Sequence, residues 1–163
     1  MTPRTFDLAY ALGAALERRK WRVATAESCT GGLVAGAITD VPGSSAWFDR
    51  GFVTYSNEAK QQLLGVPCAL LERYGAVSEE VAQALVEGAL AHSAADVAVS
   101  VTGIAGPGGA TPGKPVGMVC FGFARRDGVP RTVTHRVDGD RFAVRAASVV
   151  IALEGLNALA VSA

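Results

Sequence analysis

Helix-like and strand-like segments alternate along most of this 163-residue chain, and that alternation restricts the fold more than any other feature. Leu8, Leu12 and Leu16 recur every four residues in the first segment, which predicts an amphipathic helix. Strands that are separated by helices run parallel in one sheet and carry helices on its faces. The expected segments are helices at 5–20, 33–39, 57–64, 68–73 and 78–93 and strands at 21–26, 51–55 and 96–102.

The last third of the chain predicts a different connection. Residues 116–125 and 130–137 are strand-like with Gly128 between them, so this pair is expected to form a β-hairpin. Asp140 is expected to cap a final helix, whose buried face is formed by Val149, Val150, Leu153 and Leu156. Together these patterns predict one α/β domain over residues 1–163, a three-layer α/β/α sandwich with a mixed sheet of about five strands.

Composition excludes several classes of partner. Fifteen basic and fifteen acidic residues cancel, so there is no positive field to attract nucleic acid or an anionic membrane surface. We interpret the longest apolar stretches as too short or too broken to span a bilayer. Residues 1–5 lack the long apolar core of a signal peptide. We therefore expect a cytoplasmic protein without nucleic-acid or membrane partners.

The cysteines and histidines are too few and too scattered for metal binding. The three cysteines form neither a disulfide framework nor a zinc motif, and no second ligand stands at metal spacing from either histidine. No metal or other cofactor is expected. A Ser-His-Asp triad has only two candidates for its base. We interpret His92 as a surface residue and His135 as a structural one.

The first of three polar stretches runs from Thr25 to Gly32, where a strand ends and a helix begins. Such a junction points several backbone N–H groups at one spot and adds the positive end of a helix dipole. A nucleophile placed there can attack a substrate, and the N–H groups can hold the negative charge that results. Ser28 is the candidate, with Cys29 as its rival. The alternative is that Ser28 or Thr30 only caps the helix.

The second polar stretch covers residues 55–60. If Ser56 is the helix N-cap, Lys60 ends the first helical turn, where the dipole should lower the pKa of its ammonium group. A partly neutral lysine can act as a general base towards a serine hydroxyl. The alternative is a solvated surface lysine. Tyr55 and Lys60 are five residues apart, which excludes the pair of short-chain dehydrogenases.

The third polar stretch is the glycine-rich loop, residues 103–115, which follows Thr102. Glycines let backbone N–H groups approach a phosphate closely. Gly108 and the pair Gly113-Lys114 resemble a P-loop, but Pro115 replaces the magnesium-binding hydroxyl and a strand follows instead of a helix, so ATP hydrolysis is excluded. The alternative is a mobile connection between strands.

These motifs arrive in one order across nearly the whole chain, residues 5–159, and together they resemble the C-terminal domain of the competence/damage-inducible protein CinA. Stand-alone members of that family are nicotinamide-nucleotide amidohydrolases. The motifs that carry the resemblance are Ala26-Glu-Ser-Cys-Thr-Gly-Gly32, Tyr55-Ser-Asn-Glu-Ala-Lys60, Thr102-Gly-Ile-Ala-Gly-Pro107, Lys114-Pro-Val-Gly117 and Gly139-Asp-Arg141 with Arg145.

The resemblance implies hydrolysis of nicotinamide mononucleotide to nicotinic acid mononucleotide and ammonia, without a metal or cofactor. It implies Ser28 as the nucleophile, Lys60 as the base and Tyr55 as a residue that assists or orients them. From their spacing, Arg141 and Arg145 share one helical face, and we favour Arg145 for the phosphate of the substrate. The alternative is that Arg141 pairs with Asp138 or Asp140 and that Arg145 lies in solvent. The residues expected to bind the substrate are Cys29, Thr30, Gly31, Gly32, Thr102, Gly103, Gly106, Arg141 and Arg145.

Two other functions stay open at this point. A non-catalytic module that binds or senses pyridine nucleotides would keep the glycine-rich loop and the arginines, but would not need Lys60 within reach of Ser28. A structural or oligomerisation domain is supported only by the long apolar helix at the C-terminus. A homo-oligomer is expected in any case. Ammonia release from nicotinamide mononucleotide separates the enzyme from both alternatives.

Overall fold

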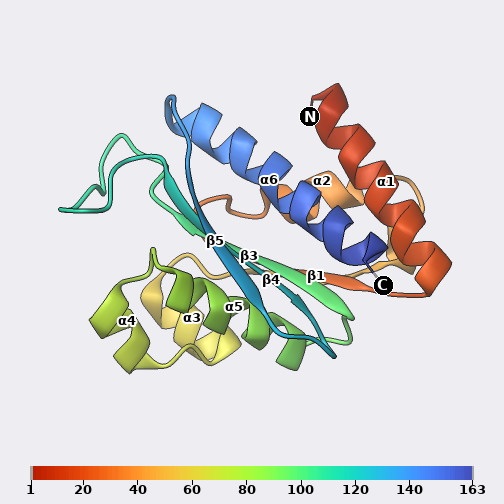
Figure 1. Cartoon of the computed structure of the whole chain (residues 1–163), viewed down its shortest axis with the longest axis horizontal. Helices are drawn as coiled ribbons and strands as arrows, with labels where there is room; N and C mark the ends of the chain where they lie inside the picture. Colours follow the sequence, from red (N-terminus) through yellow and green to blue (C-terminus); the bar gives the residue numbers. More distant parts are fainter. Residues whose placement is uncertain (1, 163) are drawn as a thin grey trace.

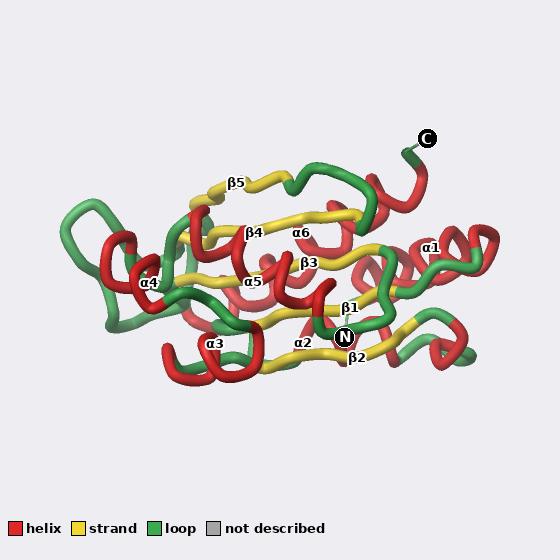
Figure 2. The backbone as a smooth tube through the Cα atoms, turned by 90° about the horizontal axis from the view of Figure 1, so that it is seen from below, coloured by secondary structure: helices red, strands yellow, loops and turns green. Residues whose placement is uncertain are grey.

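Five strands form one mixed sheet in the order β2-β1-β3-β4-β5. The computed structural model describes residues 2–162. Strand β1 (Val23–Glu27) pairs in parallel with β2 (Phe48–Val53) and with the central strand β3 (Val97–Gly103). β4 (Met118–Arg125) and β5 (Arg131–Arg136) then continue the sheet as the expected antiparallel hairpin (Figure 2). The predicted mixed sheet of five strands is confirmed.

Helices cover both faces of this sheet, which confirms the three-layer α/β/α sandwich (Figure 1). One layer contains α1 (Pro3–Arg19), α2 (Leu33–Thr39) and α6 (Arg141–Val161). The other contains α3 (Asn57–Leu64), α4 (Cys68–Tyr74) and α5 (Glu79–Ala91).

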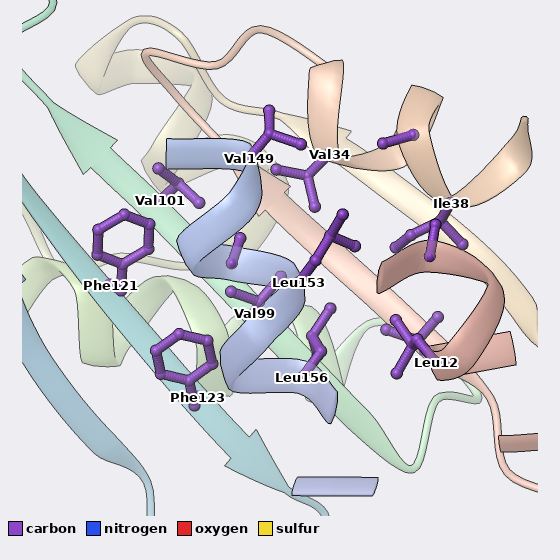
Figure 3. Close-up of a cluster of buried hydrophobic side chains, with 14 of the residues drawn as sticks. Leu12, Val34, Ile38, Val99, Val101, Phe121, Phe123, Val149, Leu153 and Leu156 are labelled. Atoms are coloured by element: carbon purple, nitrogen blue, oxygen red, sulfur yellow. The ribbon is translucent and has the colours of Figure 1, made fainter. Parts of the chain in front are cut away.

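The larger hydrophobic core lies between the sheet and the α1, α2 and α6 layer (Figure 3). Leu153 and Leu156 of α6 are fully buried there with Phe121 and Phe123 of β4. Gly155 allows this close approach, because a Cβ at that position would lie 2.1 Å from Cε1 of Phe123. Helix α6 therefore has a fixed rotation against the sheet.

Helix α6 corrects two expectations from the sequence. Within residues 2–162 it is the one helix that is long and apolar enough to cross a membrane, so the view that no apolar stretch reaches that length is wrong. Length and composition alone are weak evidence, since a core helix meets the same criteria, and α6 packs on β3 and β4. Val149 is buried as expected, but Val150 is only half-buried.

The main error in the predicted boundaries falls on β2. This strand begins at Phe48 and ends at Val53, whereas residues 51–55 were expected, and a short 3-10 turn, Ser44–Ala46, precedes it. β2 is an edge strand with mixed burial, so its polar first half lacks the apolar pattern of a central strand. Its early end brings Thr54 beside β1, where the Thr54 N–H donates to the Glu27 carbonyl at 2.8 Å.

The fold brings the functional motifs to one edge of the sheet. β1, β2 and β3 are parallel, so their carboxyl ends at Glu27, Val53 and Gly103 lie at the same edge. Ligands of open α/β sheets bind outside the carboxyl ends of the strands. The three polar stretches of the sequence start at these three ends.

Candidate active site

A cavity of about 230 Å³ lies at this edge and joins the three polar stretches. Part of its lining was predicted from the sequence and part was not. Its lining residues are Ser28, Cys29, Tyr55, Asn57, Lys60, Ala76, Val77, Thr102, Gly103, Ala105 and Arg141.

The turn between β1 and α2 carries Ser28 on a backbone that glycine makes possible. Gly31 and Gly32 have φ angles of 57° and 99°, a left-handed conformation that most side chains disfavour. Gly32 is the N-cap of α2 and provides no side chain. The interpretation of Ser28 or Thr30 as the cap of this helix is therefore wrong.

Glu27 caps α2 instead, and the sequence reasoning missed it. Its side chain is buried, and its two carboxylate oxygens accept hydrogen bonds from the N–H groups of Val34 at 2.9 Å and Ala35 at 3.0 Å. The positive end of α2 is thus neutralised by Glu27, which ties the helix to the end of β1. The sequence does contain a signal that could have indicated this role, because Glu27 is an acidic residue at the end of a buried strand and lies four residues before Gly31.

Lys60 reaches Ser28 from the opposite layer. Ser56 caps α3 as predicted, by accepting from the Ala59 N–H at 3.0 Å, and Lys60 follows in the first turn. The Lys60 Nζ lies 3.1 Å from the Ser28 Oγ. Lys60 is only 1% exposed and Ser28 is 8% exposed. The alternative of a solvated surface lysine is therefore wrong.

Three oxygen atoms surround the Lys60 Nζ. Its Nζ donates to the carbonyl oxygens of Thr54 at 2.8 Å and Tyr55 at 3.1 Å, and these oxygens can only accept. An ammonium group can donate to all three oxygens, Ser28 Oγ included, whereas a neutral amine donates to the two carbonyls and turns its lone pair to the Ser28 hydroxyl. Burial lowers the pKa of Lys60, because the ammonium form loses its hydration inside the protein. Burial is thus the main cause, where the sequence had suggested the helix dipole.

Cys29 has the opposite character. Burial raises the pKa of its thiol to about 11, because the thiolate is poorly solvated there. The thiol is therefore protonated near neutral pH, and thiols react mainly as thiolates. A thiolate at Cys29 would favour the ammonium form of Lys60, but this raised pKa keeps Cys29 neutral. Ser28 is the better placed nucleophile of the two.

Tyr55 and Arg141 form the rim of the cavity. The Tyr55 carbonyl holds Lys60, but its hydroxyl accepts a hydrogen bond from Nη2 of Arg141 at 3.1 Å. Arg141 also donates through Nη1 to the Gly106 carbonyl at 2.9 Å, which ties α6 to the glycine-rich loop. The Tyr55 hydroxyl therefore belongs to the rim, whereas its backbone orients the lysine.

Arg145 does not line the cavity that contains Ser28. It lines a second groove of about 520 Å³, formed by residues of α1, α2 and α6 and the chain beside them. Its Nε donates to the Cys29 carbonyl at 3.1 Å and its Nη2 to the Thr30 carbonyl at 3.4 Å. The guanidinium that the sequence assigned to the phosphate is thus bound to the back of the Ser28 turn.

The remaining predicted residues occupy several positions. Thr102 and Gly103 line the cavity, but the Thr102 hydroxyl donates to the Ala76 carbonyl at 2.8 Å and so holds the segment before α5. Gly106 is joined to the rim through Arg141. Thr30, Gly31 and Gly32 belong to the turn behind Ser28 and are not among the lining residues. The lining residues that were not predicted as site residues are Asn57, Ala76, Val77 and Ala105.

Comparison with known proteins identifies the class. The family model described as the CinA C-terminal domain matches residues 5–160, and the chain belongs to this family. Nicotinamide-nucleotide amidohydrolase PncC of Enterobacter agglomerans is 57% identical over 151 residues, which are 93% of this chain and 92% of that protein. The PncC of Escherichia coli K12 is 53% identical over 150 residues, covering 92% of this chain and 91% of that protein.

Longer relatives and a solved structure extend the comparison. A CinA-like protein of Akkermansia muciniphila is 51% identical over 156 residues, and the match covers 96% of this chain but only 38% of that protein. The crystal structure of competence/damage inducible protein CihA from Agrobacterium tumefaciens superposes with a TM-score of 0.95 at 46% identity, covering 98% of this chain and 97% of that one. The α/β fold with its mixed sheet is therefore that of the family.

Proposed function

We propose that this protein is a nicotinamide-nucleotide amidohydrolase, which converts nicotinamide mononucleotide and water to nicotinic acid mononucleotide and ammonia. Relatives that carry this name match nearly the full chain at 53–57% identity. The observation that carries the proposal is the contact of 3.1 Å between the buried Lys60 Nζ and the Ser28 Oγ. A binding or sensor module has no need of a buried lysine beside a serine hydroxyl.

In the first half of the reaction, neutral Lys60 takes the proton of the Ser28 hydroxyl as the oxygen attacks the carboxamide carbon. The carbonyl oxygen becomes an oxyanion in the tetrahedral intermediate. In this scheme backbone N–H groups of the turn that carries Ser28 bind that charge. The Lys60 ammonium then protonates the departing nitrogen, ammonia leaves, and an ester on Ser28 remains.

The second half regenerates the enzyme. Lys60, neutral again, takes a proton from water as the water oxygen attacks the ester carbon. The second tetrahedral intermediate collapses, Lys60 returns the proton to the Ser28 oxygen, and nicotinic acid mononucleotide is released. Both halves use the same base and the same oxyanion donors, so no metal or cofactor takes part in this scheme.

The rim of the cavity would hold the rest of the substrate. Arg141 stands on the cavity and carries a planar fork of donors that suits phosphate oxygens. Gly103 and Gly106 come from the glycine-rich loop, where the backbone can approach an anion closely. A single amidase domain over residues 1–163, a cytoplasmic location and a homo-oligomeric assembly stay predictions of the sequence.

Ammonia release by the purified protein tests this proposal. Nicotinamide mononucleotide is incubated with the wild type and with Ser28→Ala, and ammonia and nicotinic acid mononucleotide are quantified together. Equal amounts of both products from the wild type, and none from the variant, are expected. Binding of the nucleotide without any release of ammonia would instead identify a non-catalytic module.

A further inference from the structure

The link between α4 and α5, residues 75–78, forms one wall of the cavity that contains Ser28. Ala76 and Val77 of this link are lining residues, and the link rises from the lower helix layer towards the sheet (Figure 1). Val77 has the largest aliphatic side chain among the residues that line the cavity. A bulky apolar residue thus shares a small cavity with the Ser28 hydroxyl.

The two lining residues of the link have different surroundings. Ala76 packs against the hydrophobic core between the sheet and the α3, α4 and α5 layer. Val77 is half-buried, yet within residues 2–162 it belongs to neither hydrophobic core. Ala76 therefore joins the link to the interior of the fold, whereas Val77 is left to contact a ligand in the cavity.

Hydrogen bonds from two other parts of the chain fix this wall. The Thr102 hydroxyl, on β3, donates to the Ala76 carbonyl at 2.8 Å. The Lys114 ammonium group, on the glycine-rich loop, donates to the Tyr74 carbonyl at the end of α4. The link then leads directly into α5, whose N-cap is Ser78. The wall is therefore held in place by the fold before a substrate binds.

We propose that Val77 is a specificity-determining residue that packs against the pyridine ring of the substrate. This inference rests on the proposed function. The ring is bonded directly to the carboxamide carbon, which must come within about 3–3.5 Å of the Ser28 Oγ to react, so the ring enters the cavity with it. Pockets that enclose a drug-sized ligand occupy about 300–1,000 Å³. A cavity of about 230 Å³ therefore encloses this end of the nucleotide and leaves the ribose and phosphate at the rim.

Contacts in an apolar pocket discriminate between substrates by size. One methylene more or less in such a pocket changes kcat/KM by roughly 10–200-fold. Val77→Ala removes two methyl groups from the wall, so it should lower kcat/KM for nicotinamide mononucleotide on the order of tenfold. It should also make room for a methyl group on the pyridine ring, whereas Val77→Leu should reject such a group more strongly than the wild type does.

Ammonia release from nicotinamide mononucleotide and from analogues with one methyl group on each ring carbon in turn tests this inference. For at least one analogue, the ratio of its kcat/KM to that of the parent should rise on the order of tenfold in Val77→Ala and fall in Val77→Leu. Val81→Ala is the matched control, because Val81 is a fully buried valine of α5 that does not line the cavity. It should lower the thermal stability and leave every ratio unchanged. Unchanged ratios in both Val77 variants would overturn the inference.

Binding measurements separate a failure of this inference from a failure of the proposed function. If the wild type released no ammonia, the proposed function would fail, and calorimetry with nicotinamide mononucleotide would then decide the role of Val77. Packing against the ring predicts that Val77→Ala weakens binding on the order of tenfold and that Val81→Ala does not. Equal affinities of the wild type and Val77→Ala, or no binding to the wild type, would overturn the inference.

Discussion

The floor and the rim of the cavity are held in different ways. Ser28 and Lys60 on the floor are 8% and 1% exposed, and backbone carbonyls fix the lysine. Tyr55 on the rim is 60% exposed, and its hydroxyl is joined to Arg141, which is itself exposed. The contact at the rim is therefore open to solvent and to a ligand, whereas the contacts of the floor belong to the packed interior.

This difference leads us to expect that the floor acts in the chemical step and the rim in substrate binding. Burial on the floor lowers the pKa of Lys60, which suits its proposed role as the base, while the exposed position of Arg141 on the rim suits contact with an anion. Changes to the floor should therefore lower kcat, and changes to the rim should raise KM. The predictions that follow test this division, beginning with the largest expected effect.

Removal of the proposed nucleophile should have the largest effect. Ser28→Ala should lower kcat by roughly three orders of magnitude or more, as is usual when a nucleophile is deleted, while the nucleotide still binds. Steady-state ammonia release and isothermal titration calorimetry measure the two quantities. Cys29→Ala should stay active, since burial keeps that thiol protonated. Full activity in Ser28→Ala together with loss of activity in Cys29→Ala would identify Cys29, and not Ser28, as the nucleophile.

Lys60→Arg should be as inactive as Lys60→Ala, because an arginine stays protonated and cannot accept the serine proton. The pH profile of kcat carries the same information. The folded pKa of Lys60 is lowered, so the amine is neutral above that value and activity should fall as the pH drops through it. An arginine variant with most of its activity would mean that Lys60 provides charge and not base catalysis.

Glu27→Gln should cost stability as well as rate. A glutamine has one acceptor oxygen for the two N–H groups of Val34 and Ala35, and it carries no charge for the end of α2. We expect a loss of about 1–3 kcal/mol in urea unfolding, together with a lower kcat. Glu58→Gln, on an exposed site in the first turn of α3, is the control and should change stability by less than about 0.5 kcal/mol. Equal effects on stability would show that the Glu27 carboxylate does not stabilise the start of α2.

Changes at the rim should be smaller and should appear in KM. Arg141→Ala should raise KM for nicotinamide mononucleotide by on the order of tenfold, with kcat changed little, because it loses charge-assisted hydrogen bonds to the phosphate. Its preference for the mononucleotide over nicotinamide riboside should shrink. An unchanged preference would show that Arg141 does not contact the phosphate.

Tyr55→Phe should have the smallest effect. It removes only the hydroxyl that accepts from Arg141 and keeps the carbonyl that holds Lys60. We expect KM to change by about threefold or less, in line with one exposed hydrogen bond. A large fall in kcat would instead mean that the Tyr55 hydroxyl assists or orients Ser28 and Lys60, as the resemblance to the family implies.

Local patterns explain why the sequence predicted much of the fold. Helices α2 and α3 have the predicted bounds, because Ser56 and the glycine pair before α2 mark helix starts within a few residues. Ser28 and Lys60 were both singled out, since each lies where a strand end meets a helix start. These signals need no knowledge of how distant segments pack.

The remaining features depend on tertiary packing. Lys60 is buried because the fold packs α3 against the end of the sheet that carries Ser28. The sequence could therefore suggest a lower pKa for Lys60, but not that burial is its main cause. The side of the turn that Arg145 contacts is set by the rotation of α6, which Gly155 fixes through its contact with Phe123. Spacing of four residues predicts that Arg141 and Arg145 share a helical face. It does not predict that Arg141 lines the cavity with Ser28 while Arg145 binds the carbonyls of Cys29 and Thr30.

An acid-quenched reaction analysed by mass spectrometry tests the central claim most directly. The wild type is mixed with nicotinamide mononucleotide, quenched within one turnover and digested with trypsin, in parallel with Ser28→Ala. The peptide of residues 23–50 contains both Ser28 and Cys29, so fragmentation must locate the adduct. We predict an ester of nicotinic acid mononucleotide on Ser28 and no adduct in the variant. An adduct on Cys29, or undiminished ammonia release by Ser28→Ala, would contradict the account.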